Sequence, residues 1–103
     1  MTMLISNEEE FQNEVINSKT PVVVDFYADW CHPCMAMMPV LEELSQERDL
    51  KVVKVNVDEP SAYSLVQKHG IQSIPTMFIY DNGQRGERIV GTVDKNSLSN
   101  KIP

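Results

Sequence analysis

The stretch Val22-Val23-Val24-Asp25-Phe26-Tyr27-Ala28-Asp29-Trp30-Cys31-His32-Pro33-Cys34 decides the fold, because it joins a buried strand to the start of a helix. Its first seven residues are almost all apolar, as expected of a central strand that is covered on both faces. A helix then begins at Trp30-Cys31, and Pro33 suits its first turn, where a missing N–H costs nothing. We therefore predict a strand over 22–28 and a helix that runs to about Arg48.

Cys31 and Cys34 are the only two cysteines in the 103 residues, so neither has another partner in the chain. A disulfide that closes so short a loop removes little chain entropy and is a poor structural staple. The spacing suits a reversible dithiol, because the two side chains lie one turn apart on the same helix face. Cys31, at the helix N-terminus that favours a thiolate, is the expected nucleophile, and Cys34 is the expected resolving thiol.

Two other interpretations of the cysteine pair stay open. The thiols could be inert and part of the core. They could also bind zinc, but this would need two further ligands, and the chain offers only His32 and His69. His32 lies inside the motif, where it is badly placed for the same ion, so we predict no metal site.

The rest of the chain supplies alternating helices and strands. Ser6-x-x-Glu9 has the form of a capping box and opens a helix to about Asn17. Further elements are expected at Lys51–Val57 (strand), Pro60–His69 (helix, ended by Gly70), Met77–Tyr80 and Arg88–Val90 (strands around the hairpin signal Asp81-Asn82-Gly83), and from Asp94 (helix). His69 is expected in the last turn of its helix, where a cation suits the dipole. The order βαβαβαββα predicts an α/β fold in one domain over residues 1–103, with parallel crossover units and an antiparallel terminal hairpin.

Composition excludes several classes of partner. The nine Lys and Arg residues face fifteen Asp and Glu, and a formal net charge of −6 argues against binding to nucleic acid or to an anionic membrane. The N-terminus has no basic segment followed by an apolar stretch, and no run approaches the roughly 18 to 20 apolar residues of a membrane span. The cytoplasm is therefore the expected compartment, and there a Cys-x-x-Cys motif indicates redox or metal chemistry.

Asp25 interrupts the apolar strand. A buried carboxylate costs free energy unless it is partnered or protonated, so desolvation should raise the pKa of Asp25 and poise it near neutrality. The side chain is either a functional acid or a structural one satisfied by local hydrogen bonds. Trp30 next to Cys31 is expected to flank the reactive site.

The chain resembles the thioredoxin family over almost its whole length. The residues that carry the resemblance, in the family's order and spacing, are Val24–Cys34, Pro39, Lys54–Asp58, Gly70–Thr76, Asn82-Gly83 and Gly91. The resemblance implies the thioredoxin fold, a central mixed five-stranded sheet flanked by about four helices. It also implies that Asp25 lies behind Cys34 and assists its deprotonation, and that Lys54 reaches this acid; a solvated surface lysine is the alternative.

The same resemblance implies a substrate-binding loop. It predicts a cis Ile74–Pro75 bond that faces the cysteines and exposes backbone groups to a substrate peptide. Gly91 is expected to form a bulge in the last strand, to leave room for the substrate chain beside Pro75, or to do both. The chain departs from the common pattern at His32, where the family usually has Gly, at Met35, where Lys is frequent, and at Ser73, where Gly is common.

We expect, on this resemblance, a dithiol–disulfide oxidoreductase that reduces protein disulfides. No dinucleotide or flavin motif is present in the sequence, so the only redox group expected is the cysteine pair, re-reduced by an NADPH-dependent thioredoxin reductase. A monomer is expected. His32 leaves open a protein that leans towards isomerase or oxidase activity. A non-catalytic thioredoxin-like binding module is the alternative from another class.

Overall fold

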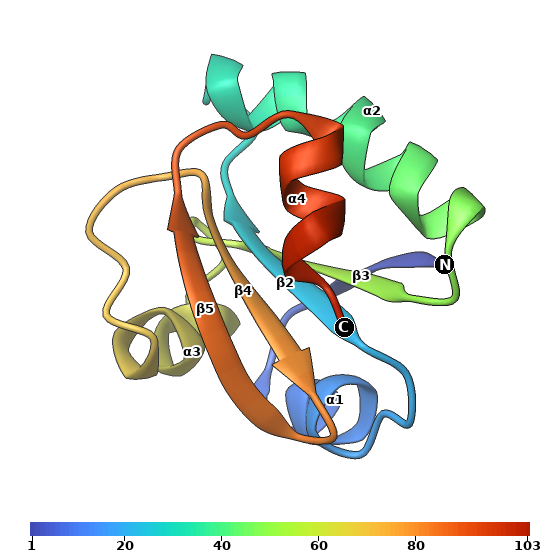
Figure 1. Ribbon diagram of the computed structural model, residues 1–103. Helices are drawn as coiled ribbons and strands as arrows, with labels where there is room; N and C mark the ends of the chain where they lie inside the picture. Colours follow the sequence, from blue (N-terminus) through green and yellow to red (C-terminus); the bar gives the residue numbers. More distant parts are fainter.

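The computed structural model describes residues 1–103, and Figure 1 shows helices packed on both sides of one sheet. The strands are β1 (Thr2–Ile5), β2 (Val22–Tyr27), β3 (Lys51–Asn56), β4 (Thr76–Asp81) and β5 (Gln84–Val90). The helices are α1 (Glu8–Phe11), continued by the π-helical segment η1 (Gln12–Ile16), α2 (His32–Glu47), the 3₁₀ turn η2 (Pro60–Ala62), α3 (Tyr63–Lys68) and α4 (Lys95–Lys101). No helix is both long and apolar enough to cross a membrane.

The five strands form one mixed sheet in the order β1-β3-β2-β4-β5. β3 pairs in parallel with both β1 and β2, whereas β4 pairs antiparallel with β2 and with β5. The predicted antiparallel terminal hairpin is confirmed, and so are the parallel crossovers from β1 to β2 and from β2 to β3. The predicted parallel crossover from β3 through α3 to β4 is wrong, because β4 enters the sheet antiparallel to β2 and therefore to β3. Because β2 and β3 are parallel, their carboxyl ends lie at the same edge of the sheet, and the cysteine motif follows one of them.

Strand β2 forms the centre of both hydrophobic layers, and all six of its residues are buried. Alternate side chains point to opposite faces, so Val22, Val24 and Phe26 pack towards α1 and α3. Val23 faces the other way, into the cluster that includes α2 and α4. Each fully buried Val or Phe side chain contributes about 1.5–3 kcal/mol, which holds the three layers together. Asp25, two positions after Val23, therefore points to the face that α2 covers.

The N-terminal cap of α1 lies one residue later than predicted. Asn7, not Ser6, accepts the hydrogen bond from the Glu10 amide through Oδ1, at 2.9 Å. Glu10 Oε1 in turn accepts from the Ser6 amide at 2.9 Å, so Glu10 takes the part expected of Glu9. Asparagine caps a helix as well as serine does, so the cap and its carboxylate partner are each one residue later than predicted, while the carboxylate still accepts from the Ser6 amide.

The predicted hairpin is confirmed, but β5 is longer than predicted. Asn82 and Gly83 have φ values of +51° and +76°, and the Asp81–Gln84 pair flanks them. β5 begins at Gln84 instead of Arg88. The sequence did not indicate its first half, because this edge strand is exposed along most of its length and shows no apolar pattern. The register shift lies between Phe78 and Tyr80, so the interpretation of Gly91 as a strand bulge is wrong.

His69 is buried, which the sequence did not indicate. Only 4% of its surface is exposed, and its ring packs against Phe11, Phe26 and Phe78. Nδ1 lies 2.8 Å from the Leu65 carbonyl, which can only accept, so Nδ1 carries the proton and Nε2 accepts from the Tyr80 hydroxyl at 2.8 Å. Burial lowers the pKa of His69, so the expected surface cation is a neutral core side chain.

Candidate active site

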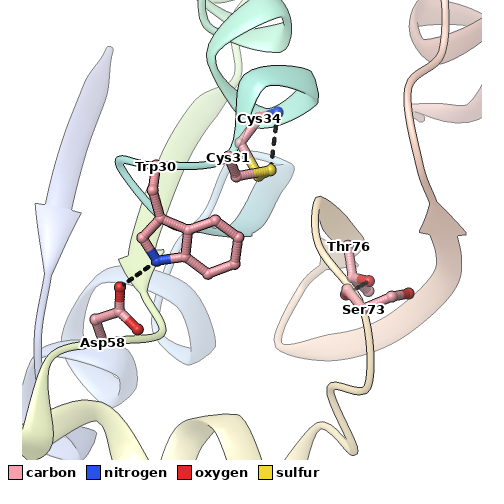
Figure 2. The surroundings of a disulfide bond; sticks show 6 residues. All are labelled: Trp30, Cys31, Cys34, Asp58, Ser73 and Thr76. Atoms are coloured by element: carbon pink, nitrogen blue, oxygen red, sulfur yellow. Dashed lines mark hydrogen bonds between the residues drawn. A yellow bond between two sulfur atoms is a disulfide. The ribbon is translucent and has the colours of Figure 1, made fainter.

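Cys31 and Cys34 form a disulfide at the N-terminus of α2, with their Cα atoms 5.2 Å apart. Cys31 is the N-cap residue, and its Sγ accepts a hydrogen bond from the Cys34 amide at 3.2 Å, as Figure 2 shows. His32 and Pro33 occupy the first turn and are both exposed. An N–H group directed at Sγ and the positive end of a 16-residue helix both stabilise a thiolate at Cys31.

Both cysteines are enclosed in the disulfide form. Cys31 is 5% exposed and Cys34 is fully buried, because Tyr27, Ala28 and Ile74 pack around them. In the disulfide form, Cys31 therefore presents only a small part of its surface to a substrate. The order of exposure is as expected, since Cys31 is the more accessible of the two.

Asp25 is fully buried, and neither of its carboxyl oxygens has a hydrogen-bond partner in the protein. It shares a sheet face with Tyr27, two residues on, which packs against the cysteine pair. Desolvation by burial raises the pKa of Asp25 to about 7, and the positive charge of Lys54 opposes this rise. The local hydrogen bonds that would make Asp25 a satisfied structural acid are not formed.

Lys54 lies directly across from Asp25, in register on β3. Its side chain is half-buried, and Nζ sits 6.0 Å from the centre of the Tyr27 ring. It forms no salt bridge with Asp25, so it does not reach the carboxyl group as the resemblance implied. The two residues interact through their charges alone.

The loop before β4 lies beside the disulfide. The Ile74–Pro75 bond is cis, as predicted, and Ile74 packs against the cysteine cluster. The Pro75 carbonyl accepts a 2.8 Å hydrogen bond from the Gly91 amide. Gly91 has a φ of +88°, and a Cβ built there would meet nothing within 4 Å, so the space beside it is open. This observation favours the prediction that Gly91 leaves room for another chain.

Trp30 stands at the rim of the site with 69% of its surface exposed. Its indole Nε1 donates a 2.7 Å hydrogen bond to Oδ2 of Asp58, and Figure 2 shows the ring lying between that carboxylate and the disulfide. Sequence reasoning did not single out Asp58. The available signal was its position just after β3, whose carboxyl end adjoins that of β2 in a parallel pair.

No group of three or more His, Cys, Asp or Glu side chains is placed to hold a metal ion. His32 and His69, the only candidate additional ligands, are not brought together: one is exposed beside Cys31, and the other lies in the core on the opposite face of the sheet.

A family model described as Thioredoxin matches residues 2–103. Thioredoxin 1 of Synechococcus elongatus is 46% identical over 94 residues, which cover 89% of this chain and 86% of that protein. This chain belongs to the thioredoxin family. The thioredoxin of Rickettsia bellii is 43% identical over 93 residues, covering 88% of this chain and 87% of the relative.

A solved structure agrees with this assignment. The structure of a point mutant of thioredoxin from Halobacterium salinarum matches with a TM-score of 0.90 at 33% identity, covering 98% of this chain and 87% of that one. The predicted thioredoxin fold is confirmed. With its active-site cysteine pair, the chain is a dithiol–disulfide oxidoreductase, and neither the isomerase or oxidase alternative nor the non-catalytic module is favoured.

Proposed function

We propose that this thioredoxin reduces the disulfides of other proteins, with Cys31 as the nucleophile. The Cys31 thiolate attacks one sulfur of the substrate disulfide, forms a mixed disulfide and releases the other substrate sulfur as a thiolate. The observation that carries this assignment is the position of Cys31 as N-cap of α2, with its Sγ 3.2 Å from the Cys34 amide. Cys34, without exposed surface, is poorly placed for the first attack.

The second step needs a thiolate at Cys34. We assign its proton to the Asp25 carboxylate, directly or through a water molecule, because an acid with a pKa of about 7 can both take and return a proton at neutral pH. The Cys34 thiolate then attacks Cys31 Sγ, which restores the intramolecular disulfide and releases the second substrate thiolate. Two electrons pass to the substrate, and the protein is left oxidised. Lys54 acts as a positioning residue that lowers the pKa of Asp25.

The substrate chain is assigned to the open strip between the disulfide and the Ile74–Pro75 loop. Gly91 leaves space beside Pro75, and Trp30 borders the strip at its other side. His32 and Pro33, exposed between the cysteines, tune the reactivity of Cys31. Electrons return from a separate donor, a thioredoxin-reductase-like enzyme, so the protein acts as an electron carrier. We further propose a cytoplasmic monomer, in keeping with a reversible disulfide that must be re-reduced there.

Trapping separates the two cysteine roles. Cys34→Ser should hold a protein substrate as a stable mixed disulfide on Cys31, identified by mass spectrometry of the linked peptides. Cys31→Ser should form no such adduct and should have no reductase activity. If Cys31→Ser traps substrate on Cys34 instead, the assigned roles are reversed.

A further inference from the structure

The exposed ring of Trp30 adjoins an apolar hollow beside the disulfide. The hollow measures about 260 Å³ and lies between the Trp30 ring, Val57 just after β3, Val66 of α3 and the loop residues Ile71 and Ile74. The hydrogen bond from Trp30 Nε1 to Asp58 holds the indole by one edge, so an open ring face and a carboxylate lie side by side. Figure 2 shows the ring beside the disulfide and the Asp58 carboxylate on the other side of the ring.

The segments that carry Trp30 and its partner Asp58 also carry further acidic residues. Asp29, Asp58 and Glu59 are exposed, and none of them forms a salt bridge. Four lysines are paired with glutamates elsewhere on the surface, namely Lys51, Lys68, Lys95 and Lys101. Met35 lies on the first turns of α2, at the other side of the disulfide. Its exposed side chain is uncharged.

An aromatic face bordered by a carboxylate suits one kind of partner group. A Lys ammonium or Arg guanidinium is attracted to the face of an indole and to a nearby carboxylate at once. The stem of the same side chain is apolar and can cover the hollow. A Glu or Asp at that place would meet the like charge of Asp58.

We propose that this surface selects disulfide substrates that carry Lys or Arg next to the attacked cysteine, with the cation on the Trp30 ring and Asp58 as its counter-ion. The proposal rests on the reductase function above and adds a substrate class to it. The attraction between the substrate cation and the Asp58 carboxylate is exposed to solvent, so the preference for Lys or Arg should weaken as the salt concentration rises.

The test uses three peptide disulfides that differ only in the residue beside the cysteine: Lys, Gln or Glu. The kcat/KM of each is divided by its rate of reduction with dithiothreitol, which removes the effect of the charge on the disulfide's own reactivity. We expect the Lys peptide to exceed the Glu peptide by about tenfold at about 0.1 M salt, with Gln between them. At about 1 M salt, the screening length is about 3 Å. The ratio of the normalised kcat/KM values of the Lys and Glu peptides should then fall to the small preference that apolar contact of the Lys stem alone provides.

A pair of variants locates the effect. Asp58→Asn keeps an acceptor for the indole N–H but removes the charge, and should lower the Lys-to-Glu ratio about threefold. Asp49→Asn removes the same charge from an exposed position beyond the far end of α2, whose 16 residues span about 24 Å, and should leave the ratio unchanged.

Equal normalised rates for the three peptides, or a preference for Glu, would overturn the selection while leaving the reductase function in place. So would a ratio that salt does not change, or an equal loss in both variants, which would point to net charge alone. Failure to reduce any of the peptides would overturn the reductase function together with the selection.

Discussion

Replacing Asp25 by Asn should stabilise the oxidised protein, by an amount that grows as the pH rises. The carboxyl group is fully buried, and neither oxygen has a hydrogen-bond partner in the protein. Burial accordingly raises the pKa of Asp25 from 3.8 to about 7. Asparagine has nearly the same shape and no charge, so the variant removes the ionisation and little else.

The magnitude follows from the two pKa values. Folding raises the proton affinity of this carboxyl group about a thousandfold, which corresponds to about 4 kcal/mol. Between about pH 4 and pH 7 the folded protein holds a proton that the unfolded chain has released, so the parent loses stability as the pH rises through this window. Above about pH 7 both states are ionised and the loss is complete. The advantage of Asp25→Asn should therefore increase by about 4 kcal/mol from about pH 4 to about pH 8 and then stay level.

The assay is guanidinium unfolding of the oxidised proteins at a series of pH values, with the difference between variant and parent taken at each pH. Other titrating groups cancel in this difference. Asp49→Asn, which removes a charge from an exposed position, is the matched control and should follow the parent at every pH. A difference for Asp25→Asn that stays constant from about pH 4 to about pH 8 would show that folding does not raise the pKa of Asp25.

Three further predictions concern the neighbouring charges. Lys54→Met removes the charge that lowers the pKa of Asp25, so this pKa should rise above about 7. The attack of Cys34 on the mixed disulfide should then slow at neutral pH. An unchanged pH profile of that attack would show that the two charges do not interact. Burial lowers the pKa of His69, so the folded protein resists protonation of this ring more than the unfolded chain does. The parent should therefore lose stability as the pH falls below about 6.5, and His69→Phe should not show this loss. Parallel profiles of unfolding free energy against pH for the two proteins would contradict this prediction. His32→Gly should lower the reduction potential by about 20–30 mV, because it removes a ring N–H that can donate a hydrogen bond to the Cys31 thiolate and so stabilise the reduced form. An equal or higher potential in the variant would exclude this role.

Local patterns predicted the centre of the fold well. The apolar run of β2, the proline in the first turn of α2 and the Asn82-Gly83 turn each carry their own signal in a few residues, and the structure has all three. The raised pKa of Asp25 was also predictable, because a carboxyl group inside a fully buried strand has few other outcomes.

The features that were missed depend on contacts between distant elements. The Trp30–Asp58 hydrogen bond joins residues that follow two different strands. His69 was assigned from its place at a helix end, but its neutral state is set by aromatic rings from α1, β2 and β4. The early part of β5 has no apolar pattern because an edge strand can be exposed on both faces.

The equilibrium reduction potential of the Cys31–Cys34 couple, measured against glutathione at neutral pH, tests most directly the claim that the protein is a reductant. We expect a potential below about −230 mV, so that the dithiol form passes electrons to most protein disulfides. A potential of about −180 mV or higher, the range of disulfide isomerases and oxidases, would contradict it.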